Sequence, residues 1–220
     1  VSAWHLRGRI ANLQPVSKPA LTIQDLCKRF HTTEVLSHLN LTVAAGEVVV
    51  LVGPNGSGKS TFLGSIGGIV IPDAGTIEIS GIDLAADPLT ARRHLRYLAQ
   101  ELLPPTGLCG REWLAFHAEV FAATPPQRHQ MEKFADLGAQ LDHLITTYSL
   151  GMRRRLALAG LMAGPAQLFV LDEPFAGVDP DHQARWVEEL TRRVTDGAGV
   201  LLAAHAADER AVVALEKGVP

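Results

Sequence analysis

One glycine-rich segment contains the residue types that hold phosphate groups. It reads Gly53-Pro54-Asn55-Gly56-Ser57-Gly58-Lys59-Ser60 and fits the P-loop pattern G-x-x-x-x-G-K-[ST]. Its glycines allow backbone conformations in which successive N–H groups turn toward one phosphate. Lys59 would reach the β- and γ-phosphates of a nucleotide, and the Ser60 hydroxyl would hold a magnesium ion. The competing interpretation is a glycine-rich turn before an ordinary helix.

The elements on either side of this segment stand in the order that a P-loop needs. Residues 48–52 are apolar and rich in valine, which predicts a strand buried on both faces. Thr61 and the residues after it can continue as a helix, whose N-terminus adds unpaired N–H groups and a positive dipole end. Strand, glycine loop and helix together predict a nucleotide site.

A second apolar segment, residues 168–171, ends in the adjacent acids Asp172 and Glu173. Because α/β sheets place ligands at the carboxyl ends of their strands, Asp172 could hold magnesium through water. Glu173 would then emerge toward the γ-phosphate. Two acids after a strand are by themselves equally consistent with a solvated turn. The P-loop upstream favours the magnesium site.

Between these segments lies Tyr148-Ser149-Leu150-Gly151-Met152, followed by three arginines. Ser149 is a suitable N-cap, Gly151 permits close backbone approach, and the first helical turn offers another anion-binding end. The competing interpretation is a surface helix with a basic face. The segment resembles the signature of the ATP-binding subunit of ABC transporters, usually Leu-Ser-Gly-Gly-Gln, although three positions differ. The form Ser-x-Gly-Met-Arg is similar to that of export-type ABC systems.

The resemblance implies roles for four further residues. Phe30 stands where the family has an aromatic that stacks on adenine, and Gln100 matches a glutamine that touches magnesium and the attacking water. Asp179, in the loop 174–180, matches an aspartate that crosses to a partner subunit, and His205 matches a histidine at the γ-phosphate. From the residue types alone, these would be a core phenylalanine, a loop glutamine, a helix cap and a structural histidine.

The resemblance also implies an assembly and a function. ATP and Mg²⁺ would be the ligands, with Glu173 orienting or deprotonating the attacking water. Two subunits would pack head to tail, so that Ser149 and Gly151 of one face the γ-phosphate held by the other. The implied nucleotide contacts are Phe30, Gly53, Pro54, Asn55, Gly56, Ser57, Gly58, Lys59, Ser60, Thr61, Ser149, Gly151 and Asp179. The implied metal contacts are Ser60, Gln100 and Asp172, and the implied catalytic residues are Glu173, His205 and Gln100.

The implied cellular role is transport. ATP would close the pair of subunits and hydrolysis would open it, driving a membrane-spanning permease from the cytoplasmic face of the plasma membrane. One alternative is a regulatory ABC-type module with little hydrolysis. Another is a soluble ABC ATPase acting on DNA or ribosomes, but such relatives carry coiled-coil insertions or tandem ATP modules that this chain lacks. A formal net charge of −3 gives no indication of nucleic-acid binding.

The order of segments predicts an α/β fold, which the resemblance specifies as a P-loop NTPase (RecA-like) core with an antiparallel β subdomain and an α-helical subdomain. Residues 48–52, 97–99, 168–171 and 200–204 predict core strands, and residues 21–25 and 40–43 predict antiparallel strands. Residues 111–123 and 130–144 predict helices joined by Thr124-Pro-Pro, within a helical subdomain over about residues 103–162.

Several expectations concern the ends of the chain and its general properties. Residues 1–20 are expected to be a flexible extension without a signal peptide, before one ATP-binding domain over residues 21–220. Residues 211–218 could supply a further strand. No apolar stretch approaches the roughly 18 residues that cross a bilayer. Cys27 and Cys109 lack metal-type spacing, which predicts free thiols in a reducing compartment.

Overall fold

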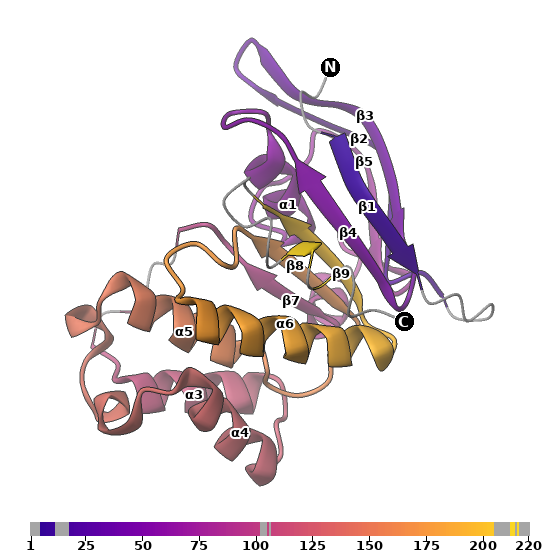
Figure 1. Cartoon of the computed structure of the whole chain (residues 1–220). Helices are drawn as coiled ribbons and strands as arrows, with labels where there is room; N and C mark the ends of the chain where they lie inside the picture. Colours follow the sequence, from indigo (N-terminus) through magenta and orange to yellow (C-terminus); the bar gives the residue numbers. More distant parts are fainter. Residues whose placement is uncertain are drawn as a thin grey trace.

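A mainly parallel sheet forms the centre of the part of the chain that the computed structural model describes, residues 5–11, 18–101, 105, 107–204, 212, 213 and 215 (Figure 1). The sheet has the order β1-β4-β9-β8-β7. Its strands are β1 (His5–Ala11), β4 (Glu47–Val52), β7 (Leu95–Leu98), β8 (Leu168–Asp172) and β9 (Gly199–Ala203). Strands β4, β9, β8 and β7 are parallel neighbours, so their carboxyl ends meet at one edge.

A second, antiparallel sheet packs beside the first and has the order β3-β2-β5-β6 (Figure 1). Its strands are β2 (Leu21–Phe30), β3 (Thr33–Val43), β5 (Ala74–Ile79) and β6 (Ile82–Asp83). Strands β2 and β3 form a long hairpin and extend well beyond the two short strands predicted from the sequence. The predicted α/β class with an antiparallel sheet is confirmed.

Strand β4 is buried on both faces, as its run of valines predicts. Val48 and Val50 belong to one hydrophobic core, whereas Val49 and Leu51 belong to the other. Successive side chains of a strand point to opposite faces, so an unbroken apolar sequence is what a two-sided strand requires. The first core lies between the parallel sheet and the helical layer. The second lies between the two sheets and includes Phe62 of the helix that follows β4.

Helices cover the parallel sheet, and in the described residues between β7 and β8 every named element is helical. Figure 1 shows α5 and α6 beneath the sheet, with α3 and α4 farther from it. The helices are α1 (Lys59–Ile66), α2 (Pro88–Arg93), α3 (Gly110–Val120), α4 (Pro125–Ala135), α5 (Leu150–Gly160) and α6 (Pro180–Thr195). Two 3₁₀ helices, η1 (Gly138–Asp142) and η2 (Ile145–Thr147), link α4 to α5.

The predicted bounds of the helix at 130–144 were wrong. Helix α4 begins at Pro125, directly after Thr124, whose backbone N–H donates to Gln127 Oε1 at 2.7 Å in a capping box. The two prolines therefore start the helix instead of separating it from α3, because proline is well accommodated in the first turn. The helix ends at Ala135, since Asp136 adopts a left-handed conformation with φ 49°.

Both ends of the chain differ from the expectations. Within the segment expected to be a flexible extension, β1 pairs with β4 along the edge that β9 leaves open. The predicted strand at 211–218 was also wrong, because residues 212, 213 and 215 are helical. Val212 and Leu215 are both buried, and a spacing of three places two residues on one face of a helix but on opposite faces of a strand.

Trp186 of α6 provides a test of how the helical layer is attached. It is 0% exposed and packs edge-on against Phe134 of α4, with ring centroids 5.4 Å apart. We expect Trp186→Ala to lower the free energy of unfolding by about 3–5 kcal/mol, the usual cost of emptying such a site. Urea denaturation followed by circular dichroism measures it, with Leu89→Ala, at a side chain 76% exposed, as the control. Equal midpoints for the two variants would contradict this packing.

Candidate nucleotide-binding site

The P-loop leaves the carboxyl end of β4 and leads directly into α1. Gly56 and Gly58 have φ values of 75° and 94°, which an L side chain rarely adopts. A Cβ on Gly58 would also lie 3.0 Å from Val35 Cγ1, so β3 packs closely against the loop. Gly58 is the N-cap of α1 and provides no side-chain cap, which leaves the first-turn amides for another acceptor.

Lys59 folds back over this loop. Its Nζ donates to the carbonyl oxygens of Gly53 at 2.6 Å and Pro54 at 2.9 Å, and the residue is 6% exposed. The ammonium group is thus held at the mouth of the loop by neutral acceptors. A phosphate oxygen there would replace them with a charge-assisted interaction, which is the stronger kind.

Three oxygen-bearing side chains meet beside Lys59. The Ser60 hydroxyl lies 3.5 Å from Gln100 Oε1, and its interaction with the carboxyl of Asp172 lowers the pKa of that carboxyl. One hydroxyl proton cannot satisfy both acceptors at once. The residues come from α1, from just beyond β7 and from the end of β8, so the parallel sheet brings them together.

Asp172 is the most strongly constrained of the three. It is 1% exposed, and its Oδ1 has no hydrogen-bond partner among the described residues. Burial raises the pKa of its carboxyl, an effect opposed by the Ser60 hydrogen bond and by the charges of Lys59 and Arg154. A buried, incompletely bonded carboxylate next to two neutral oxygens fits a hard cation such as Mg²⁺, which prefers oxygen ligands.

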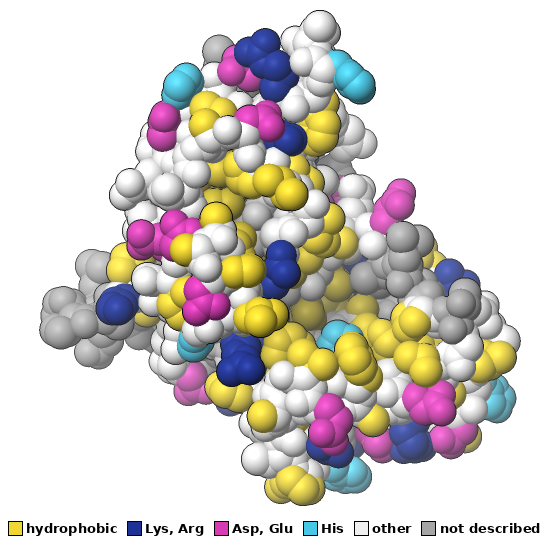
Figure 2. Space-filling model, turned by 180° about the vertical axis from the view of Figure 1, so that it is seen from behind, with side chains coloured by type: hydrophobic (Ala, Val, Ile, Leu, Met, Phe, Trp, Pro, Cys, Tyr) yellow, Lys and Arg dark blue, Asp and Glu magenta, His cyan; other side chains and the backbone are white. Residues whose placement is uncertain are grey.

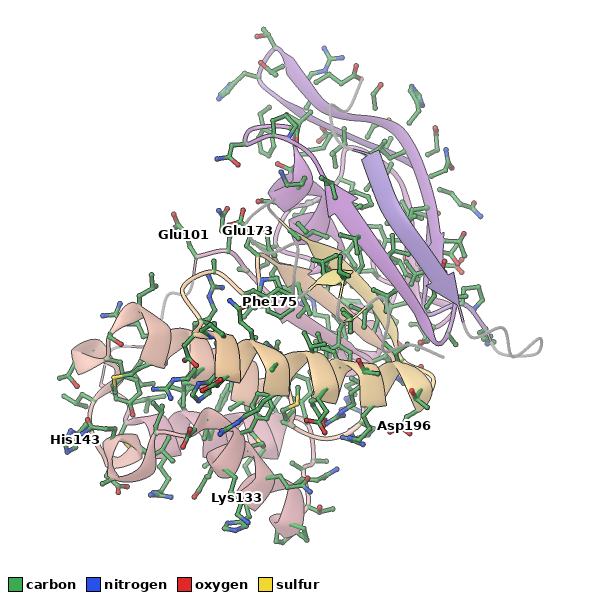
Figure 3. All side chains as sticks on the ribbon, in the orientation of Figure 1. Glu101, Lys133, His143, Glu173, Phe175 and Asp196 are labelled. Carbon is green, nitrogen blue, oxygen red and sulfur yellow. The ribbon has the colours of Figure 1, made fainter. Side chains whose placement is uncertain are left out.

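Glu173 follows directly and sits at the same edge. It comes directly after the carboxyl end of β8, and Figure 3 shows it well apart from Asp196, the C-cap residue of α6. It is 8% exposed and has a φ of 50°, an unusual conformation for a non-glycine residue, held by a hydrogen bond from its N–H to Ala203 O at 3.0 Å. This conformation turns the chain sharply after the strand. His205, the other predicted residue at this edge, lies outside the described residues.

Phe30 is not a core residue, so that alternative is wrong. It ends β2 and is 45% exposed, with Lys28 Nζ 5.2 Å from the centre of its ring. Its strand pairs with β3, and Val35 of β3 contacts the P-loop at Gly58. The hairpin that packs against the P-loop therefore also carries a partly exposed aromatic ring at Phe30.

The signature segment begins α5 in the helical layer, apart from the P-loop (Figure 1). Ser149 is the N-cap, accepting a hydrogen bond from Met152 N at 3.2 Å, as predicted. A Cβ on Gly151 would lie 3.2 Å from Gly177 O, so the backbone of the loop before α6 packs closely against this position. The interpretation of the following arginines as a solvated basic face is wrong, because all three guanidinium groups donate to backbone carbonyls. The acceptors are Tyr148 O for Arg153, Gln100 O for Arg154 and Asp136 O for Arg155.

Asp179 is the N-cap of α6, which confirms the helix-cap interpretation of its sequence. Its Oδ1 accepts from His182 N at 3.1 Å and lies 2.8 Å from His182 Nδ1, and these contacts lower the pKa of Asp179. On its other side, His182 Nε2 lies 3.1 Å from Asp136 Oδ2 at the end of α4. Sequence reasoning missed His182 and Arg154. The Asp-x-x-His spacing after a cap residue was the available signal for His182, and nothing in the arginine run distinguished Arg154.

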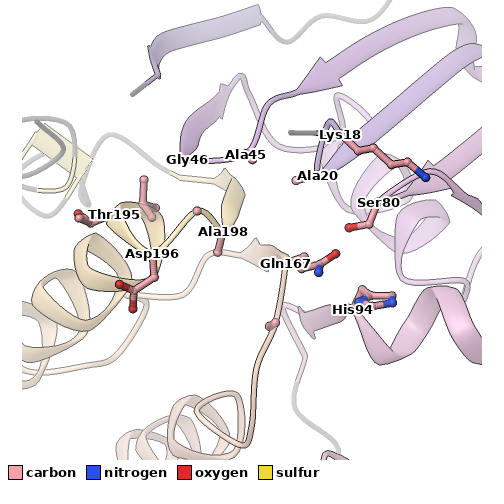
Figure 4. Close-up of a pocket in the computed structure, with 13 residues that line it drawn as sticks. Lys18, Ala20, Ala45, Gly46, Ser80, His94, Gln167, Thr195, Asp196 and Ala198 are labelled. Atoms are coloured by element: carbon pink, nitrogen blue, oxygen red, sulfur yellow. The ribbon is translucent and has the colours of Figure 1, made fainter. Parts of the chain in front are cut away.

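A cavity of about 830 Å³ lies away from these residues (Figure 4). Its lining includes Gly46, Gln167 and Ala198, which precede β4, β8 and β9. It therefore opens at the amino ends of the parallel strands. The P-loop, Gln100 and the two acids all follow carboxyl ends, so the cavity is not part of the candidate site.

Comparison with known proteins gives the same family as the motifs. The family model described as ABC transporter matches residues 36–176. The daunorubicin/doxorubicin resistance ATP-binding protein DrrA of Streptomyces peucetius is 34% identical over 203 residues, covering 90% of this chain and 61% of DrrA. The lipopolysaccharide export system ATP-binding protein LptB of Haemophilus influenzae is 36% identical over 197 residues, covering 84% of this chain and 80% of LptB. The chain thus spans less than two thirds of DrrA.

A solved structure agrees with this assignment. The structure described as the ATP-binding subunit of an ABC transporter superposes with a TM-score of 0.78 at 30% sequence identity, covering 87% of this chain and 82% of that one. The superposition therefore includes most of both chains. The chain therefore belongs to the ABC transporter family, as a nucleotide-binding domain.

Proposed function

We propose that this chain binds ATP with Mg²⁺, hydrolyses it, and thereby drives transport through a separate membrane permease. The observation that carries the proposal is the meeting of Lys59 with the oxygens of Ser60, Gln100 and Asp172 at the mouth of the P-loop. A cation for phosphate and an oxygen set for a metal are the two parts that phosphoryl transfer needs.

Binding uses groups that the structure already orients. Lys59 would exchange the carbonyls of Gly53 and Pro54 for phosphate oxygens, and the free amides at the start of α1 would donate to the same phosphates. Ser60 and Asp172 would hold Mg²⁺, directly or through water, and the bound ion would neutralise charge that develops on the phosphates. Phe30 would stack on the adenine.

Hydrolysis would depend on Glu173. Its carboxylate lies one residue beyond Asp172 and could accept a proton from a water at the γ-phosphate. Gln100, whose Oε1 faces Ser60, would position that water and the metal. His205 remains predicted as a further contact to the γ-phosphate.

A second subunit would complete the site. The N-terminus of α5, with Ser149 as its cap, lies in the helical layer, whereas Lys59 lies at the end of β4. In a head-to-tail pair, Ser149 and Gly151 of one copy would face the γ-phosphate of the other, and Asp179 would approach the same interface. Leu150, beside them, is 65% exposed, which suits a residue that becomes covered on pairing.

The partner in the membrane would be a permease contacted from the cytoplasmic side. Within the described residues, no helix is long and apolar enough to cross a bilayer. Apolar side chains stand exposed at Ile69, Ile71 and Leu89, and Figure 2 shows hydrophobic side chains gathered in the hollow between the strand-rich part and the helical part. The names of DrrA and LptB refer to drug resistance and export, which favours export. A regulatory module with little hydrolysis is the alternative.

Lys59→Ala tests nucleotide binding. Removing the ammonium should weaken ATP by about 1.5–3 kcal/mol, the usual worth of a hydrogen bond to a charged group, because neutral amides cannot replace its charge. Isothermal titration with Mg-ATP measures the change, and Lys133→Ala, on the exposed side of α4, is the control. Unchanged affinity in Lys59→Ala would remove the P-loop from the proposal.

Phe30→Ala tests adenine stacking. The variant should bind ATP about 1–3 kcal/mol more weakly, because the stacking ring is lost. It should keep its thermal stability, because this ring is exposed. Phe30→Trp should bind ATP normally, since its ring can still stack. Fluorescent-nucleotide titration measures the affinities. Phe116→Ala removes another exposed ring, on α3, and should leave affinity unchanged. An equal loss in both variants would show that Phe30 does not contact the base.

Glu173→Gln tests hydrolysis and the shared site together. The amide keeps the shape of the side chain but cannot accept the proton, so Mg-ATP should bind, turnover should fall at least about 100-fold, and a dimer should accumulate in light scattering. Glu188→Gln, on the exposed face of α6, should behave as wild type. Adding Gly151→Asp should abolish the dimer, since a carboxylate would meet the γ-phosphate of the other copy.

The outcomes separate the parts of the proposal. Turnover at the wild-type rate in Glu173→Gln would show that this residue is not the base. A dimer that persists with Gly151→Asp would show that the signature segment does not contribute to the partner's site. Wild-type protein that binds Mg-ATP without any turnover, even with its permease, would favour the regulatory alternative.

A further inference from the structure

Arg154 joins the signature helix to the segment that carries Gln100. It lies on α5 and is 4% exposed. Its guanidinium donates from Nη2 to Gln100 O at 3.1 Å and from Nη1 to Ala99 O at 3.4 Å. These carbonyls belong to two successive residues just beyond β7, so the planar fork of the side chain bridges two successive peptide groups.

The side chain of Gln100 points toward the candidate metal site while its backbone is held by Arg154. Gln100 Oε1 lies 3.5 Å from Ser60 Oγ, and Gln100 O accepts from Arg154. The peptide group that Arg154 holds is therefore the anchor of the side chain that faces Ser60. A small displacement of that peptide would displace the amide at the metal site.

The two neighbouring arginines have different partners. Arg153 donates to Tyr148 O at 3.0 Å within the signature loop, and Arg155 donates to Asp136 O at 3.0 Å at the end of α4. Of these three, Arg154 is the one that bonds to the described residues just after β7, and it lies little more than one helical turn from the cap residue Ser149. Helix α5 thus connects the predicted dimer contact to Gln100 through one side chain.

We infer that Arg154 is a positioning residue for Gln100: it transmits movement of α5 to the segment after β7 and sets the place of the Gln100 amide relative to Ser60. The inference rests on the proposed role of Gln100 at the metal and the attacking water. Apolar packing could hold two elements together equally well, but a bidentate bond to carbonyls also fixes the orientation of a peptide.

The test uses Arg154→Met, which keeps the length of the side chain without its donors, and Arg154→Lys, which keeps the charge without the fork. Arg193→Met is the matched control, because Arg193 donates to the carbonyls of Met162 and Gly164, both at 3.0 Å, away from Gln100. Steady-state turnover of Mg-ATP by the purified chain is measured in each variant. Amide hydrogen exchange of residues 96–101 is measured in the nucleotide-free protein.

We expect Arg154→Met to lower kcat about 10- to 100-fold while KM for ATP stays within about twofold, since misplacing a catalytic contact affects the chemical step more than binding. Arg154→Lys should recover part of the loss. Hydrogen exchange of residues 96–101 should accelerate in Arg154→Met and stay unchanged in Arg193→Met. If Arg154→Met fails to fold, Arg154→Lys carries the same comparisons.

A double-variant cycle separates positioning from general stability. Because Arg154 acts through Gln100, Arg154→Met should reduce kcat less than about twofold when Gln100→Ala is already present. The inference would be overturned if the two substitutions reduced kcat by independent factors that multiply in the double variant. It would also be overturned if Arg154→Met had wild-type kcat while Gln100→Ala had a reduced kcat. Either result would leave the role of Gln100 intact. Normal turnover in Gln100→Ala would overturn both, whereas the Lys59 and Glu173 variants would still decide whether the chain is an ATPase.

Discussion

The parallel pairing of β4, β9, β8 and β7 is the constraint on which the candidate site depends. The registers match Leu51 with Ala203, Leu202 with Leu171, and Leu171 with Leu98, so four strands end at nearly the same level. Residues that follow these strands must gather at one edge, however far apart they lie in the sequence. The P-loop, Gln100 and the two acids gather there for this reason, and an antiparallel arrangement would have sent half of them to the opposite edge.

Burial on both faces of this sheet makes its ends chemically unusual. The strands contribute almost entirely apolar side chains to two cores, and the polar groups at their ends are drawn into the same low-dielectric surroundings. Asp172 is the clearest case, because its pKa is raised chiefly by burial and one of its oxygens lacks a partner among the described residues. Such a carboxylate is costly alone and favourable beside a cation. The same edge that gathers the residues therefore favours the metal and phosphate that they would bind.

Arginines attach the helical layer to this sheet through backbone carbonyls. Arg96 of β7 is 1% exposed, donates to the carbonyls of Ala163 and Pro165 after α5, and lies 3.5 Å from the ring centre of Phe121 after α3. Burial lowers its pKa to about 9. Arg154 makes the reverse connection, from α5 to the end of β7. Guanidinium groups bond directionally, so these contacts fix the orientation of the helices as well as their distance from the sheet.

The sequence alone determined that β4 is buried on both faces, and it identified the P-loop, the acid-ended strand and the helix caps at Ser149 and Asp179. Each of these features depends on local residue types with a characteristic spacing. The sequence did not determine that Phe30 is exposed, that β1 pairs with β4, or that α4 begins at its prolines. Edge pairing and exposure depend on which surfaces meet, and a capping box competes with loop formation in ways that composition does not resolve. The three arginines show the difference most plainly: their sequence is the same on a solvated face or in a buried network. Only the packing of α5 against α3 and α4, with its Arg154 at the end of β7, decided which carbonyl each guanidinium reaches, because hydrogen-bond partners distant in sequence exist only once the chain has folded.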